Sequence, residues 1–252
     1  MTVRELYTLL SERFSPSLSE IWDNDGLMCC PDPEGAVSRV LFSLDVTDTV
    51  VERAIETGAD VIISHHPLVF SKLSSLTTDT PVGRRLVRLT RAGISVFSFH
   101  TRFDRAEGGV NDILARLFHL SDVVPLGEGE ASLGRVGILP EVMTLEDFAE
   151  SVKRALGTAF VQVWDASRPV SRVAVVGGEG KDLIDAARHA GADTYLSGRL
   201  GYHAMQDAPI NLIEAGHYYT ERPSLSALEE AVKTVLPTVK TEIYTPNPLD
   251  MY

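Results

Sequence analysis

The amino-acid sequence predicts an α/β fold of two lobes, each with a mostly parallel sheet flanked by helices. Short β-branched and aromatic runs alternate with amphipathic helical patterns along nearly the whole chain. The same alternation resumes after a turn-rich, acidic stretch at 120–132. The 252 residues, 44% of them hydrophobic, suffice for one large domain or two modest ones. We therefore expect an N-terminal lobe over 1–124 and a C-terminal lobe over 125–252.

The first lobe is expected to begin with an amphipathic helix over 1–14. Three apolar runs too short for typical helices predict strands at 39–45, 60–64 and 94–99. Helical patterns with suitable start and stop residues predict three further helices. The first follows Thr47, a possible N-cap, and ends at Gly58. The second spans 81–93, with Pro81 at its start and Gly93 at its end, and the third spans 111–120.

The second lobe repeats this alternation. Its apolar runs predict strands at 134–139, 159–164, 172–176, 194–198, 210–214 and 239–244. Helices are expected over 144–156, over 181–191, in a short segment after 198, and from about 220. The spacing of Thr144 and Asp147 is typical of a capping box at the start of the first of these helices.

Composition excludes several functional classes. The formal charge is −12, which disfavours unspecific nucleic-acid binding and binding to anionic membranes. No apolar run approaches the length of a membrane-spanning helix, and the acidic residues within 1–14 are unlike a signal peptide. Cys29 and Cys30 are adjacent and poorly placed to bridge each other, so we expect a reduced, cytoplasmic setting.

Three of the predicted strands are followed by histidine. His65 and His66 come after the strand at 60–64, His100 after the strand at 94–99, and His217 shortly after the strand at 210–214. Ligands of open parallel sheets bind beyond the carboxyl ends of the strands, so these imidazoles are candidates for one site. His119 and His189 lie in helical runs instead, and we interpret both as partly exposed helix residues.

Two carboxylates accompany these histidines, since Asp104 follows His100 by four residues and Glu221 follows His217 by four. Such nitrogen and oxygen ligands suit zinc, iron, manganese or cobalt. They exceed the need of one tetrahedral zinc, whereas two metals sharing a carboxylate would use them all. These residues also have ordinary alternatives. Asp104 suits an Asx turn, Glu221 suits the first turn of a helix, and His65 and His66 could cap a strand or bond backbone carbonyls.

Five stretches of the chain resemble the sequence blocks of the Nif-three-like dinuclear metal protein family, many of whose members are named type 2 homologues of GTP cyclohydrolase 1. They occur in the family's order and across nearly the whole chain. The stretches are WDNDGL (22–27), SHHPLVF (64–70), HTRFD with GGVND (100–112), GADTYLSGRLGYHAMQDA (191–208) and AGHYYTE (215–221).

The resemblance implies a dinuclear metal site in a cleft between the two lobes. The ligands it implies for two divalent ions, of zinc, iron or manganese, are His65, His66, Asp104, His217 and Glu221. His100 then resembles a neighbouring residue that orients a ligand. The short connector at 120–132 is similar to that of members without a central insert, which form toroidal hexamers.

One position departs from the family pattern, because Arg199 stands in GRLGYH where the family usually has an acid. That acid would either serve the site or form a local salt bridge, and both interpretations remain open. Tyr202 and His203 are retained, and His203 is the candidate catalytic acid–base residue.

Two further features have ordinary interpretations. The VVGGEGKDL stretch lacks the third glycine of a dinucleotide fingerprint, so it predicts a tight β–α turn, although its amides could hold a phosphate. Trp22 and Trp164 are expected to be core or interface aromatics.

The resemblance implies a hydrolase that converts GTP to dihydroneopterin triphosphate and formate through a metal-activated water. A bimetallic phosphoesterase is an alternative, because the same hydroxide suits attack on phosphate. A metal-binding interaction or regulatory protein with little turnover is a second alternative. The expected partners are a small-molecule substrate and further copies of the same chain.

Overall fold

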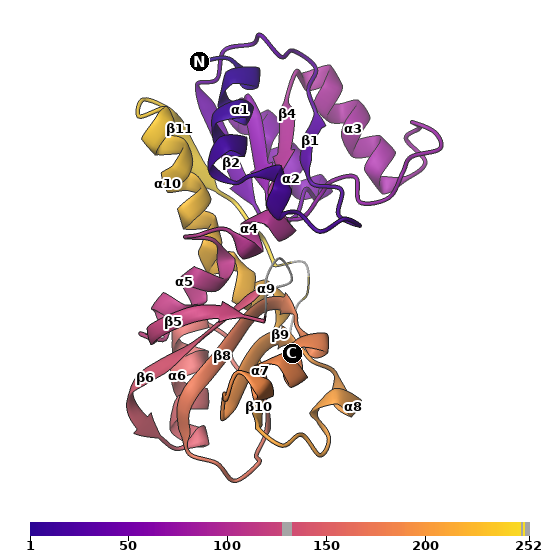
Figure 1. Ribbon diagram of the computed structural model, residues 1–252. Coiled ribbons are helices and arrows are strands. Elements are labelled where there is room, and N and C mark those ends of the chain that lie inside the picture. The colour runs from indigo at the N-terminus through magenta and orange to yellow at the C-terminus, as the bar shows by residue number, and fades with distance from the viewer. Residues whose placement is uncertain (128–132, 248, 250–252) are drawn as a thin grey trace. The chain divides into compact units, whose positions relative to one another are not determined.

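The computed structural model describes residues 1–127, 133–247 and 249. The described chain divides into two compact units: unit 1 comprises 1–106 and 225–252, and unit 2 comprises 107–224. Each unit is an α/β structure with its own sheet (Figure 1). Within the described ranges, none of the helices combines the length and apolar character that crossing a bilayer requires.

Unit 1 contains a five-stranded sheet in the order β1-β4-β3-β2-β11. Its strands are β1 (Gly26–Cys29), β2 (Arg39–Ser43), β3 (Val61–Ser64), β4 (Ser95–Ser98) and β11 (Lys240–Ile243). The pairings β4–β3, β3–β2 and β2–β11 are parallel, and β1 is antiparallel to β4. The inner strands β2, β3 and β4 are nearly all buried, as expected for parallel strands covered on both faces.

Helices cover both faces of the unit 1 sheet (Figure 1). The main helices are α1 (Val3–Arg13), α2 (Asp48–Thr57), α3 (Pro81–Ala92) and α10 (Leu225–Val235), with the short α4 (Thr101–Arg105) and the 3₁₀ turn η1 (Pro16–Leu18) beside them. The apolar face of α2 packs with α3 against Leu41, Ile62 and Val96, which are in register across β2, β3 and β4. Thr47 caps α2, and Gly58 ends it in the left-handed conformation, as predicted.

Unit 2 contains a six-stranded sheet in the order β5-β6-β8-β9-β10-β7. Its strands are β5 (Ser121–Leu126), β6 (Gly134–Met143), β7 (Gln162–Trp164), β8 (Val170–Glu179), β9 (Thr194–Arg199) and β10 (Asn211–Glu214). Only β8–β9 and β9–β10 are parallel among the described pairings; β5–β6, β6–β8 and β10–β7 are antiparallel. A mostly parallel sheet thus describes unit 1 better than unit 2, where two of the five described pairings are parallel.

Two apolar clusters cover the two faces of this sheet. The first cluster contains Phe148 of α6 with Val173 and Val175 of β8. The second contains Ala187 of α7 with Ala174 and Val176, which point to the other face of β8. The helical elements of unit 2 are α5 (Val110–Leu117), α6 (Leu145–Leu156), α7 (Ile184–His189), α8 (Tyr202–Met205), α9 (His217–Glu221), and the 3₁₀ turns η3 (Lys181–Leu183) and η4 (Arg222–Ser224).

The path of the chain differs from the sequence expectation in two respects. The chain crosses from one unit to the other after Ala106 and again after Ser224, whereas we placed one boundary at 124/125. The second crossing exists because β11 pairs with β2 and α10 packs against α1. The expected connector at 120–132 contains the strand β5, and its residues 128–132 lie outside the described part.

Candidate metal centre

In unit 1, the histidines after β3 and β4 lie at the same edge of the sheet. Ser64 and Ser98 are in register, so the carboxyl ends of the two strands coincide. The amides of His65 and His66 donate to the carbonyls of Ser43 and Leu44. The backbone that carries both imidazoles is therefore still hydrogen-bonded to the end of β2. Pro67, which has no amide hydrogen, follows and ends this pairing.

His65 is fully buried and held in one tautomer. Its Nδ1 donates to the Phe99 carbonyl at 2.9 Å, and a carbonyl can only accept. The lone pair that can coordinate a metal is therefore on Nε2, which lies 3.6 Å from Oδ1 of Asp104. Asp104 is on α4 and only 8% exposed. A nitrogen lone pair and a carboxylate that face each other at this distance suit a shared cation.

His66 and His100 repeat this arrangement. His66 Nδ1 donates to Asp45 Oδ1 at 2.9 Å, and His100 Nδ1 donates to Asp23 Oδ1 at 2.9 Å. The ligand atoms of His65, His66 and His100 all lie within 4.8 Å of one another. Because carboxylate partners of this kind orient metal-binding histidines, His100 is placed as a possible ligand as well as a neighbour of the ligands.

The WDNDGL stretch anchors this group through its two aspartates. Asp23 accepts hydrogen bonds from His100 and from Thr101, both its amide and its hydroxyl. Burial alone would raise the pKa of Asp23, but the hydrogen bonds from His100 and Thr101 outweigh it and lower this pKa to about 2. Asp25 holds Arg102 in a bidentate ion pair, with Nε at 2.8 Å and Nη2 at 2.6 Å. Both aspartates thus fix the start of α4, which carries Asp104.

In unit 2, the candidate ligands are one turn apart on α9, which follows β10. His217 Nε2 lies 3.1 Å from Oε1 of Glu221. The Glu221 side chain is 4% exposed, whereas that of His217 is 44% exposed. A buried carboxylate beside an accessible imidazole provides an oxygen and a nitrogen donor at one point.

Two glycines allow α9 to lie directly on the ends of β8 and β9. A Cβ at Gly198 would approach the Gly178 carbonyl and the Thr220 hydroxyl to 2.5 Å. A side chain at Gly178, where φ is +66°, would enter the space occupied by Glu221. The amides of Gly177 and Gly178 donate to Asn111 and Thr220. Gly177 and Gly178 therefore lie within β8 beneath α9, and the tight turn that we expected comes at Gly180, between β8 and η3. The amides of Gly177 and Gly178 are engaged within the protein instead of facing a phosphate.

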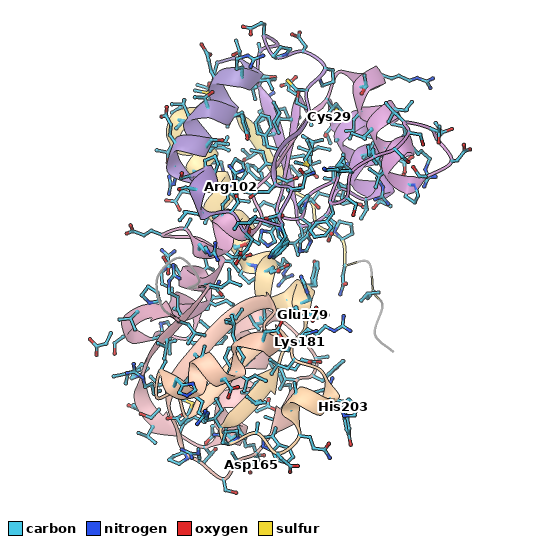
Figure 2. All side chains as sticks on the ribbon, turned by 45° about the vertical axis from the view of Figure 1, so that its right-hand side comes forward. Cys29, Arg102, Asp165, Glu179, Lys181 and His203 are labelled. Carbon is cyan, nitrogen blue, oxygen red and sulfur yellow. The ribbon has the colours of Figure 1, made fainter. Side chains whose placement is uncertain are left out.

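The remaining residues singled out in the sequence lie elsewhere. His203 is exposed on α8, where its ring centroid is 5.3 Å from that of Tyr202 (Figure 2). Arg199 is the last residue of β9 and is in register with Glu179. The pKa of Glu179 is lowered chiefly by the hydrogen bond from Lys181, and the charge of Arg199 adds to this effect. His119 and His189 are exposed at the ends of α5 and α7.

The donor set fits divalent metal ions in chemistry. Each unit presents histidine nitrogens beside a buried carboxylate, at the carboxyl ends of its parallel strands. The orienting residues Asp23, Asp45, Gly178 and Gly198 were not identified as such from the sequence. The signal for them was a family block for Asp23 and the Gly-Gly and Ser-Gly pairs at the strand ends for the glycines.

Comparisons with known proteins identify the family of this chain. A family model described as Duf34/NIF3 (NGG1p interacting factor 3) matches residues 1–248. The chain is 33% identical over 242 residues to a Clostridium perfringens protein named "GTP cyclohydrolase 1 type 2 homolog", covering 92% of each chain. It is 32% identical to the "Protein NIF3 homolog" of Schizosaccharomyces pombe, covering 86% of this chain and 84% of the other.

Solved structures share the whole fold. A Staphylococcus aureus protein described as hypothetical is 27% identical, with a TM-score of 0.91 over 100% of this chain and 99% of that one. Reduced HcgD from Methanocaldococcus jannaschii is 26% identical, with a TM-score of 0.85 over 96% of this chain and 97% of that one.

Proposed function

Because this chain belongs to the Duf34/NIF3 family, we propose that it is a metal-dependent hydrolase of the GTP cyclohydrolase type. In this proposal the ligands of two divalent ions are His65, His66, Asp104, His217 and Glu221. The substrate is GTP, and the products are dihydroneopterin triphosphate and formate.

The observation that carries the proposal is the paired donor geometry. His65 Nε2 lies 3.6 Å from Asp104 Oδ1, and His217 Nε2 lies 3.1 Å from Glu221 Oε1. Both residues are buried, since Asp104 as a whole is 8% exposed and Glu221 3%. Burying a carboxylate is costly unless a cation or hydrogen-bond donors compensate its charge, and a divalent ion bound between each carboxylate and its imidazole would provide that compensation.

Divalent ions bound at such ligands supply a hydroxide nucleophile near neutral pH and polarise the group under attack. Asp45 and Asp23 hold the imidazoles of His66 and His100 by accepting from Nδ1. Phe99 does the same for His65 through its carbonyl. His203, exposed after β9, is proposed to move protons between substrate and solvent.

The test combines metal analysis with turnover. Purified protein loaded in turn with zinc, iron and manganese is expected to retain two ions per chain and to convert GTP into a pterin that fluoresces after oxidation. His203→Gln is expected to lose turnover and keep its metal. Glu221→Gln is expected to weaken metal binding, and His119→Ala, an exposed residue after α5, is the matched control.

The outcomes separate the three functions considered for this fold. Background fluorescence with cleavage of a generic phosphodiester would replace the cyclohydrolase by a phosphoesterase. Bound metal with no turnover of either substrate would favour a binding or regulatory protein. Equal metal retention by Glu221→Gln and His119→Ala would refute the ligand assignment itself.

Assembly is a separate part of the proposal. Following the family resemblance, we expect a closed homo-oligomer, a hexamer, in agreement with the general preference of soluble oligomers for closed symmetry. Light scattering that reports a monomer at micromolar concentration would contradict it.

A further inference from the structure

Two large aromatic side chains are exposed beside the metal-ligand group of unit 1. Trp22 is 61% exposed and Phe70 is 54% exposed. Their ring centroids are 6.1 Å apart, with the planes tilted by 58°. Trp22 was expected to be a core or interface aromatic. A core position within this chain is excluded, because more than half of its surface faces outward, whereas the interface expectation stays untested. An exposed aromatic pair is a common feature of binding sites.

Both rings contact the imidazole of His100 edge-on. The centroid distances are 6.2 Å from Trp22 and 6.5 Å from Phe70, with interplanar angles of 75° and 79°. The His100 ring is in turn 5.3 Å from that of His65 and 5.6 Å from that of His66. The aromatic pair is therefore separated from the candidate metal ligands by a single imidazole.

Hydrogen bonds of the neighbouring residues tie down the two chain segments that carry these rings. Asp23, next to Trp22, is tied to His100 and Thr101. The side-chain amide of Asn24 donates to the carbonyl of Val69, the residue before Phe70. The two aromatic segments are thus attached to each other and to the ligand group, although the rings themselves remain exposed. A positioned ring loses little conformational freedom when a ligand stacks on it.

We propose that Trp22, supported by Phe70, is a stacking platform for the planar heteroaromatic ring of the substrate. The tilt between the two rings leaves no parallel slot, so the ligand ring lies on the exposed face of Trp22. This inference rests on the proposed function and adds to it the residues that hold the base of the substrate, or of a related fused-ring compound.

Charge and position both favour such a ring over other occupants. The chain has a net charge of −12, so affinity for an anionic nucleotide needs a non-electrostatic contribution near the metal ions. Stacking on tryptophan provides that contribution for any base, because every base has a π-face. The attachment of both aromatic segments to the metal-ligand group favours a substrate ring over a protein partner.

The first measurement uses Trp22 as its own probe. Trp164→Phe removes the other tryptophan, which is in unit 2 and donates to the Ala208 carbonyl at 2.9 Å. In this background, guanosine and GTP are expected to quench Trp22 fluorescence in the zinc-loaded protein. Inorganic triphosphate, which has the charge but no ring, is expected to leave the fluorescence unchanged.

The second measurement compares affinities for guanosine by calorimetry. Trp22→Leu is expected to weaken binding ~5- to 150-fold, the range for losing one base–aromatic stack. Trp22→Phe restores a π-face and is expected to recover most of the affinity. Ile21→Ala removes a fully exposed apolar neighbour and is expected to have no effect. Zinc content, measured for every variant, is expected to remain that of the unmodified chain.

Each outcome decides one of the two proposals. Quenching and a Trp22→Leu loss without any GTP turnover would support the stacking platform and refute the hydrolase. Turnover with a KM unaffected by Trp22→Leu would overturn the platform and leave the hydrolase standing. Two results together would overturn the platform in favour of an interface between copies. Trp22 fluorescence would change with protein concentration but not with added guanosine, and Ile21→Ala would weaken guanosine binding as much as Trp22→Leu does.

Discussion

Replacing Asp25 with asparagine is expected to destabilise unit 1 strongly, because it leaves the Arg102 guanidinium buried without its counter-charge. Both side chains of this bidentate pair are 3% exposed, and Arg102 lies within the body of unit 1 (Figure 2). Asp25 also accepts from the amide of His100 and from the hydroxyl of Ser19. Breaking one partner of such a buried pair costs ~3–5 kcal/mol.

A surface ion pair of the same unit sets the comparison. Arg4 and Glu34 are 3.5 Å apart with side chains 65% and 73% exposed. An exposed pair of this kind contributes about 0–1 kcal/mol, so Glu34→Gln is expected to change the free energy of unfolding by less than that. Asp25→Asn and Glu34→Gln remove the same charge and keep a similar shape, which makes the difference between them a measure of burial.

Urea denaturation followed by circular dichroism measures both changes. A double-mutant cycle with Arg102→Met is expected to show that the double variant loses clearly less than the sum of the single losses, because no unpaired charge then remains. Losses that are equal for Asp25→Asn and Glu34→Gln, or single losses that simply add, would refute this reasoning.

Three further outcomes follow from the geometry. Gly198→Ala is expected to cost ~1–3 kcal/mol by overpacking and to weaken metal binding, because its Cβ would press against the Gly178 carbonyl and α9; metal titration of this variant at wild-type affinity would contradict it. Burial raises the pKa of the Cys29 thiol, so in a Cys30→Ser variant alkylation by iodoacetamide should reach half its maximal rate at a higher pH when folded than in urea. A midpoint unchanged by urea would count against that assignment. Chelation should lower the melting temperature while both α/β units stay folded, since a metal at a thousandfold its Kd stabilises by roughly 4 kcal/mol; His119→Ala should respond as wild type does and Glu221→Gln less.

The sequence by itself predicted what local chemistry controls. Thr47 caps α2, and Thr144 accepts from the Asp147 amide at the start of α6, as their spacing indicates. The inner strands were found because parallel strands buried on both faces are continuous apolar runs. His65, His66 and His100 directly follow such runs in the sequence. This position predicted that they lie at the same edge of the sheet, since a parallel sheet brings the ends of its strands together.

The tertiary structure decided what depends on residues distant in the sequence. The assignment of β11 to the unit 1 sheet follows from its pairing with β2, some 200 positions earlier, which no local pattern encodes. The role of Gly198 depends on the closeness of α9, and that of Asp25 on the buried guanidinium of Arg102. The exposure of Trp22 was also unpredictable, because an apolar side chain carries no local sign of whether other elements will cover it. Periodicity and capping act over a few residues, whereas burial and strand order are set by the whole chain.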